Sequence, residues 1–141
     1  MRKTTASIVL YNNPPEELLR VLECVSREGI ERLWLVDNSQ SDALRHVADG
    51  LERVEYIFTG KNLGYGGGHN VAMRRSLEMG ADYHVVINPD ITWKGDVLGT
   101  LGEYMDSHPD VGQVMPMVRY PDGRPQRLCK LLPSPLPLFG R

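Results

Sequence analysis

The alternation of short apolar runs with segments of helical periodicity is the feature that most constrains the fold of this chain of 141 residues. Four runs rich in β-branched and aromatic residues are each too short for a helix and are typical of buried strands. These runs lie at 5–11, 33–36, 54–58 and 83–87. The segments between them predict helices over 15–28, 41–51 and 70–79. This alternating order is typical of a mostly parallel sheet with helices on both faces.

Local signals support these boundaries. A helix is expected to begin near Pro15, because Glu16 and Glu17 would lie in its first turn, where negative charge is favoured, and Gly29 would close it as a C-terminal cap. Beyond the fourth strand, the pattern predicts a helix over 95–107, a strand over 111–115 and a turn at 120–123.

We therefore expect an α/β protein, a three-layer α/β/α sandwich with a mostly parallel sheet. The expected domain spans residues 1–118, and residues 119–141 are expected to form a turn and a Pro-rich tail. Prolines that alternate with apolar residues exclude a helix or a central strand there, so the tail should run extended. We expect this tail to be the start of a second half of the protein that this sequence does not contain. The alternative is a natural extended tail.

Composition narrows the class of protein. Sixteen basic and eighteen acidic residues give a net charge of −2, which argues against a nucleic-acid partner. The two cysteines, Cys24 and Cys129, have no metal-ligand or disulfide-framework spacing, and we expect reduced thiols. No apolar run reaches the ~18 residues of a membrane span. We expect a soluble cytoplasmic protein and leave peripheral membrane contact, at the inner face of the membrane, open.

Polar residues follow several of the expected strands. Ligands of open parallel sheets bind beyond the carboxyl ends of the strands, near the point where the strand order reverses. The residues that would lie there are Tyr11 and Asn12 after the first strand, Asp37, Asn38 and Ser39 after the second, and Asn88 and Asp90 after the fourth. Any one of them could be an ordinary turn or helix cap, and Asp37 in particular could either bind a ligand or cap the next turn. Their coincidence at one edge of the sheet predicts a pocket.

A glycine cluster follows the third strand. Gly64, Gly66, Gly67 and Gly68 precede the expected helix, whose N–H groups and positive dipole end would favour an anion such as a diphosphate. The cluster matches neither the dinucleotide fingerprint, which belongs after the first strand, nor a P-loop, which needs Gly-Lys-Ser or Gly-Lys-Thr. Close packing of the helix on the sheet is the alternative explanation.

One carboxylate could hold a metal ion. Mg²⁺ commonly takes one or two carboxylates and completes its shell with substrate phosphates and water, so Asp90 could suffice beside a diphosphate. Its alternative role is that of a helix-start residue. The histidines show no metal-ligand spacing, and nothing assigns a proton-transfer role to His69 beside the glycines.

Taken together, these segments resemble the amino-terminal, nucleotide-binding half of a family 2 glycosyltransferase with the GT-A fold, of the rhamnosyltransferase-like kind. The resemblance covers roughly residues 7–118. It rests on Ile8-Val9-Leu10-Tyr11-Asn12, Val36-Asp37-Asn38-Ser39 with Asp42 following, Asn62-x-Gly64-x-Gly66-x-Gly68-x-Asn70, and Ile87-Asn88-Pro89-Asp90. Each piece is weak alone, and their combination in this order is specific.

The resemblance implies an inverting glycosyltransferase that uses a nucleoside diphosphate sugar, assisted by Mg²⁺ or Mn²⁺, with a glycan or lipid-linked acceptor in polysaccharide biosynthesis. Tyr11 and Asn12 would line the nucleotide pocket, and Asp37 would bind the base. Asn62, Gly64 and Asn70 would border the sugar diphosphate, and Asp90 would bind the metal.

The chain departs from the family pattern in two ways. Asn88 replaces the first aspartate of the DxD-type motif, so the metal assignment depends mainly on Asp90. The family's catalytic carboxylate belongs to a later segment, and Glu103, Asp110 and Asp122 lack a motif that would identify a base. A non-catalytic nucleotide-sugar-binding module is therefore the alternative. A dinucleotide or flavin protein is disfavoured, because Asn12-Asn13-Pro14-Pro15 replaces a glycine-rich first turn.

Overall fold

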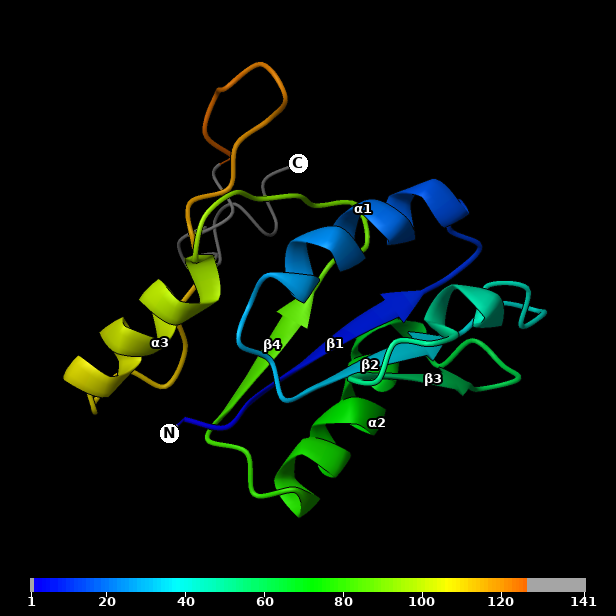
Figure 1. Ribbon diagram of the computed structural model, residues 1–141, viewed down its shortest axis with the longest axis horizontal. Coiled ribbons are helices and arrows are strands. Elements are labelled where there is room, and N and C mark those ends of the chain that lie inside the picture. Colours follow the sequence, from blue (N-terminus) through cyan, green and yellow to red (C-terminus); the bar gives the residue numbers. More distant parts are fainter. Residues whose placement is uncertain (1, 127–141) are drawn as a thin grey trace, which may run out of the picture.

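A computed structural model describes residues 2–126 of the chain. Its elements, in chain order, are β1 (Thr4–Leu10), α1 (Pro15–Ser26), β2 (Arg32–Asp37), the 3₁₀ helix η1 (Arg45–Ala48), β3 (Val54–Phe58), α2 (Gly64–Glu78), β4 (Tyr83–Ile87) and α3 (Val97–Ser107). The four strands form a parallel sheet of order β3-β2-β1-β4, in which Ile8 of β1 is in register with Leu35 of β2 and Ile87 of β4. All four expected strands are thus present (Figure 1).

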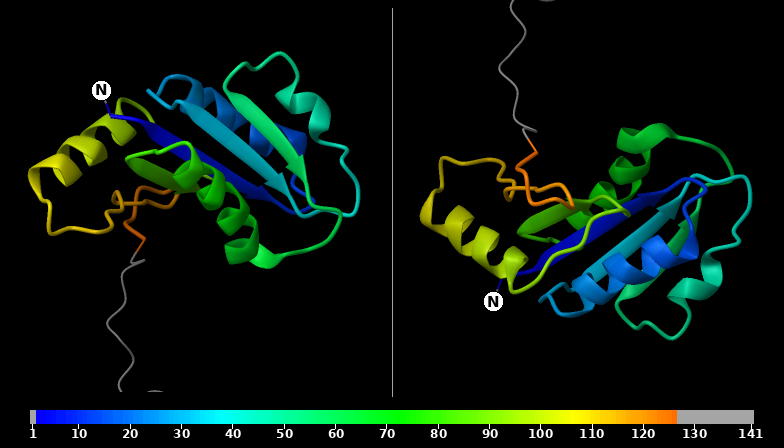
Figure 2. Two further views of the ribbon diagram at one scale, coloured as in Figure 1. Left: turned by 90° about the horizontal axis from the view of Figure 1, so that it is seen from below. Right: turned by 90° about the horizontal axis from the view of Figure 1, so that it is seen from above.

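Helix α1 covers one face of the sheet. Pro15 occupies its first turn and Glu16 and Glu17 follow, as the sequence predicts. Its buried stripe packs on alternate side chains of β1 and β2, which together form the larger core cluster. The members of this cluster include Ala6, Ile8, Leu10, Leu18, Val21, Leu22, Val25, Leu33 and Leu35. Helix α2 lies on the opposite face, so the expected three layers are present (Figure 2).

The glycine cluster lies inside α2 and not before it. The helix begins at Gly64, whereas the expected start was Asn70. Gly68 is buried, and a Cβ at this position would lie 2.7 Å from Val9 Cγ2 on β1. Gly68 therefore allows the helix to approach the sheet closely, which was the alternative explanation for the cluster, whereas a Cβ at Gly64 or Gly66 would have no neighbour within 4 Å.

Two further expectations are wrong. The segment 41–51 contains only the short η1, which ends where Asp49 adopts an extended backbone conformation and Gly50 follows with a φ of 77°. The segment 111–115 is not a strand, since no described strand pairs with it and Gly112 and Pro116 interrupt the run. The turn at 120–123 is confirmed by the bridge between Arg119 and Pro125 that flanks it.

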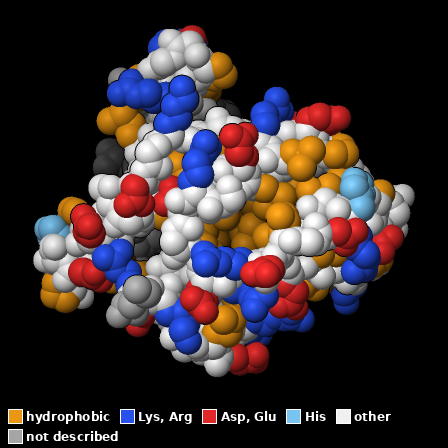
Figure 3. Space-filling model, in the orientation of Figure 1, with side chains coloured by type: hydrophobic (Ala, Val, Ile, Leu, Met, Phe, Trp, Pro, Cys, Tyr) orange, Lys and Arg blue, Asp and Glu red, His pale blue; other side chains and the backbone are white. Residues whose placement is uncertain are grey.

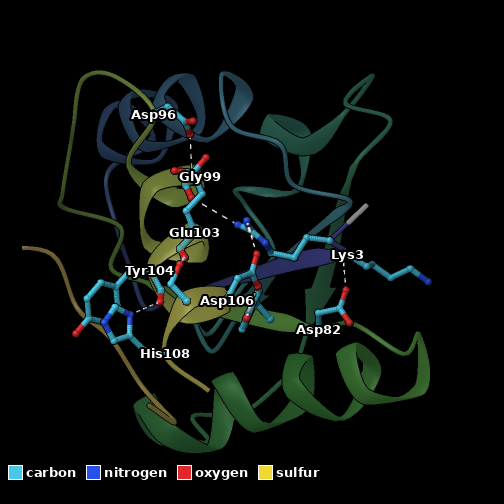
Figure 4. Close-up of polar contacts among 11 residues, drawn as sticks. Lys3, Asp82, Asp96, Gly99, Glu103, Tyr104, Asp106 and His108 are labelled. Carbon is cyan, nitrogen blue, oxygen red and sulfur yellow. Dashed lines mark hydrogen bonds and ion pairs between the residues drawn. The ribbon is translucent and has the colours of Figure 1, made fainter. Parts of the chain in front are cut away.

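Helix α3 is capped at its first turn from two directions. Asp96 Oδ1 accepts a hydrogen bond from Gly99 N–H at 2.9 Å (Figure 4). The buried carboxylate of Glu28, just after α1, accepts from Val97 N–H and Leu98 N–H at 3.2 Å each, and from Trp93 Nε1–H at 2.6 Å. A side chain distant in sequence thus fixes the segment that leads from β4 into α3.

The surface has mixed charge. Acidic and basic side chains are intermingled on the face shown in Figure 3, which carries no extended basic patch. No helix within residues 2–126 has the length and apolarity needed to span a bilayer. The Pro-rich tail expected at the end of the chain lies outside the described residues.

Candidate functional site

The strand order reverses between β1 and β4. From β1 the chain adds β2 and β3 on one side and β4 on the other, which places the switch point between β1 and β4. A cleft of about 490 Å³ lies at the carboxyl ends of these strands. Its position agrees with the rule for ligand sites of open parallel sheets.

Six of the eleven predicted site residues line this cleft. They are Tyr11, Asn38, Asn62, Gly64, Asn88 and Asp90. The structure thus brings together residues from three strand ends and from the start of α2. The other predicted residues are not among its lining residues: Asn12, Asp37, Ser39, Gly66 and Asn70.

Asp37 is fully buried at the end of β2. Its Oδ1 accepts from Ser39 N–H at 2.8 Å, and its Oδ2 accepts from the hydroxyl of Tyr56 on β3. Burial, followed by this hydrogen bond and the carboxylate charge, raises the pKa of Tyr56. Both oxygens of Asp37 therefore have partners within the chain, as its capping alternative requires, and because the side chain is fully buried, a nucleobase contact would need the neighbouring residues to move.

Asn38 and Asn62 hold the start of α2. Asn38 Nδ2 donates to Gly64 O at 3.0 Å, and Asn62 Oδ1 accepts from Gly64 N–H at 2.8 Å. Gly64 itself has a φ of 73°, in the region that favours glycine. These contacts place the positive end of α2 at the cleft, where an anion would be stabilised.

A hydrogen bond holds the turn after β1. Asn12 has a φ of 54°, and its N–H donates to Ser39 Oγ at 2.8 Å. This bond joins the turns that follow β1 and β2. Gly66 and Asn70 are exposed on α2, outside the cleft lining.

Sequence reasoning missed five lining residues. They are Val9, Asn13, Glu17, Tyr65 and Pro89. Glu17 was interpreted only as a first-turn acid of α1, although it lines the cleft beside Asn13, whose Nδ2 donates to its Oε2 at 3.3 Å. Tyr65 could have been identified from the sequence, because it is an aromatic residue between glycines. In the structure it lies in the first turn of α2 and is not one of the buried residues of this helix.

The cleft is acidic. Glu17 and Asp90 line it, and none of its described lining residues is Lys or Arg. Asp90 is exposed, and no hydrogen bond or ion pair to its carboxylate is found within residues 2–126. No described group of three or more His, Cys, Asp or Glu residues could hold a metal by itself. The donor set fits an Mg²⁺-like ion that takes one carboxylate and receives its remaining oxygens from a diphosphate and water.

A buried polar chain lies beneath the cleft. Ser7 Oγ of β1 is 2.8 Å from His69 Nδ1 on α2 and 2.8 Å from His84 Nε2 on β4. His84 Nδ1 is 2.9 Å from Thr5 Oγ1, which is 2.6 Å from Ser76 Oγ. Burial lowers the pKa of His69 to about 4, and burial together with the nearby His69 lowers the pKa of His84 to about 4. Both imidazoles are therefore neutral at pH 7 and serve as hydrogen-bonding groups of the core.

The fold and the cleft define an α/β protein with a candidate ligand site at the carboxyl ends of a parallel sheet, and comparisons with known proteins give its family. The family model of glycosyl transferase family 2 matches residues 5–134, and the chain belongs to this family. The expected membership of family 2 and the expected layered α/β fold are thereby confirmed.

Relatives with known activities are similar to most of this chain. An N-acetylglucosaminyl-diphospho-decaprenol L-rhamnosyltransferase of Mycobacterium tuberculosis is 28% identical over 137 residues, which are 89% of this chain and 44% of that protein. The dTDP-rhamnosyl transferase RfbF of Shigella flexneri is 26% identical over 76% of this chain and 36% of its own length. A hexosyltransferase of low-salt glycan biosynthesis, Agl10 of Haloferax volcanii, is 38% identical over 60% of this chain and 27% of its own length.

A solved structure supports the fold. TarS of S. aureus superposes on 76% of this chain and 20% of its own chain with a TM-score of 0.58 and 19% sequence identity. The chain spans less than half the length of the curated relatives named above.

Proposed function

We propose that this chain forms the donor-binding part of an inverting, metal-assisted glycosyltransferase that uses a nucleoside diphosphate sugar. The observation that carries the proposal is the cleft at the β1/β4 switch point, which Asp90 lines together with the N-terminus of α2 and with Asn38, Asn62 and Asn88. The expected cytoplasmic location, where soluble nucleotide sugars would be the donors, is part of the proposal.

The charge of the cleft supports a metal. A diphosphate placed beside Glu17 and Asp90 would meet like charge, because the cleft lining has no basic side chain and Arg20 lines an adjoining pocket together with the same two carboxylates. A divalent cation on Asp90 would neutralise the leaving diphosphate. Asp90 would hold this ion, while the first turn of α2 would bind the phosphoryl oxygens.

The reaction that this arrangement serves is a displacement at the anomeric carbon. An acceptor hydroxyl oxygen forms the new C–O bond from the face opposite the diphosphate as the old bond breaks, and the diphosphate leaves with the electron pair. Stabilising that departing charge is the contribution of the residues described. The relatives support a rhamnosyl donor carried on thymidine diphosphate and a glycan or lipid-linked acceptor.

Binding is tested with Asp90→Ala. Calorimetric titration of thymidine diphosphate in Mn²⁺ should show an affinity lowered at least about tenfold, about 1.4 kcal/mol, because the variant loses its metal ligand. Asp110→Ala, at an exposed position outside the cleft, is the control and should bind as the parent chain does. Equal affinities for the Asp90 variant and the parent chain would remove the metal role.

Transfer is tested separately. Because the chain covers less than half of its relatives, a binding module without transferase activity is the second candidate. Incubation of the full-length protein that contains this chain with thymidine diphosphate rhamnose and a panel of lipid-linked and soluble glycan acceptors should yield glycosylated product. Donor binding without product would favour the binding module.

A further inference from the structure

Tyr65 spans the cleft from α2 to the end of β4. Its side chain is 56% exposed, and its hydroxyl donates to Asn88 Oδ1 at 2.7 Å. Asn88 belongs to the loop that also carries Asp90, so this bond links the first turn of α2 to the proposed metal-binding loop. Both residues line the cleft, and nothing in the sequence pointed to their pairing.

The ring of Tyr65 is fixed from the core side. One helical turn later, His69 packs against it edge-to-face, with ring centroids 4.5 Å apart and planes at 71°. His69 is buried and is itself held by Ser7 on β1. Burial and the charge of Asp90 raise the pKa of the Tyr65 hydroxyl, which therefore remains a donor at pH 7. The ring and the hydroxyl thus have fixed positions before any ligand binds.

This contact decides what Asn88 can offer a ligand. A carboxamide has one oxygen, which accepts, and one NH₂ group, which donates. Since the Tyr65 hydroxyl occupies Oδ1, the oxygen is a weaker ligand for a cation, and the NH₂ group has no hydrogen-bond partner within the described residues. Asn88 is therefore better suited to donate to an anionic oxygen than to coordinate a metal.

We infer that Tyr65 is a positioning residue that orients the Asn88 amide as a hydrogen-bond donor to a phosphoryl oxygen of the diphosphate, and leaves Asp90 as the single metal ligand on this loop. The inference rests on the proposed donor-binding function. Its consequence is that part of the affinity for a nucleoside diphosphate does not depend on metal.

The test is calorimetric titration of thymidine diphosphate, with EDTA and then with Mn²⁺, into the parent chain, Tyr65→Phe and Asn88→Asp. Tyr65→Phe should lower the metal-free affinity about fivefold, the value of a typical hydrogen bond, because the amide is no longer held. Asn88→Asp should weaken metal-free binding more than Tyr65→Phe does and tighten Mn²⁺-dependent binding, because a second carboxylate replaces the donor. Tyr104→Phe, which removes an exposed hydroxyl on α3, is the matched control and should change neither affinity.

A second readout needs no ligand. In ¹⁵N–¹H spectra, the side-chain NH₂ signals of Asn88 should shift in Tyr65→Phe and stay in place in Tyr104→Phe. Metal-free affinity that is unchanged in Tyr65→Phe, or absent from the parent chain that binds in Mn²⁺, would overturn the inference and leave the proposed function intact. A parent chain that binds no nucleoside diphosphate under either condition would remove the proposed function itself.

Discussion

Gly68 shows how one residue sets the distance between helix and sheet. A methyl group at this position would lie 2.7 Å from Val9 Cγ2 and 3.3 Å from Asn38 Nδ2. Gly68→Ala should therefore lower the free energy of unfolding by about 1–3 kcal/mol, the usual cost of overpacking, as measured by urea denaturation. It should also disturb the Asn38 bond to Gly64 at the edge of the cleft.

The matched control is Gly66→Ala in the same helix. A Cβ at Gly66 has no neighbour within 4 Å, so alanine should raise stability by up to about 1 kcal/mol through its better helix propensity. Equal stability of the two variants would show that the cluster does not serve close packing.

At the scale of elements, Glu28 ties the end of α1 to the start of α3. Its buried carboxylate accepts three hydrogen bonds from residues 93–98, the segment that follows the Asp90 loop. Glu28→Gln should cost about 1–3 kcal/mol, because an NH₂ group would face N–H donors. Amide hydrogen exchange should report faster exchange at Val97 and Leu98.

Glu31→Gln, at an exposed position on the same connection, is the control for Glu28 and should leave stability and exchange unchanged. Retained protection at Val97 and Leu98 in Glu28→Gln would mean that Asp96 caps α3 without help.

For the whole molecule, the buried histidines predict loss of stability in acid. Their pKa values are about 4 in the folded chain against an ordinary 6.5, so between these values the unfolded chain binds protons that the folded chain does not. Stability should be full above pH 6.5 and fall as the pH drops toward 4, with a melting temperature several degrees lower in thermal scans. His69→Gln should reduce the slope of the unfolding free energy against pH by nearly the value for one bound proton. His108→Gln, at an exposed position, should leave this slope unchanged. An unchanged slope in His69→Gln would place the acid sensitivity elsewhere.

Much of the fold followed from local patterns. The four strands and helices α1 and α3 were predictable because burial on both faces produces short apolar runs, and a half-buried helix produces a 3.6-residue period. The 3₁₀ segment at Arg45–Ala48 and the unpaired segment at 111–115 were not, since their conformation depends on what packs against them.

The candidate site was predictable in part. Asn38, Asn62, Asn88 and Asp90 line the cleft because parallel strands deliver their carboxyl ends to one edge of the sheet. Asp37 is engaged by Tyr56, a pairing across neighbouring strands that no local pattern encodes.

By itself, the sequence determined the alternating elements, the polar strand ends and the family resemblance, because these depend on residues close together in the chain. Only the tertiary structure decided that α2 begins at Gly64, that Glu28 caps α3 and that Tyr65 reaches Asn88. These features depend on contacts between residues 23 to 70 positions apart, whose geometry exists only once the sheet has brought its faces and edges together.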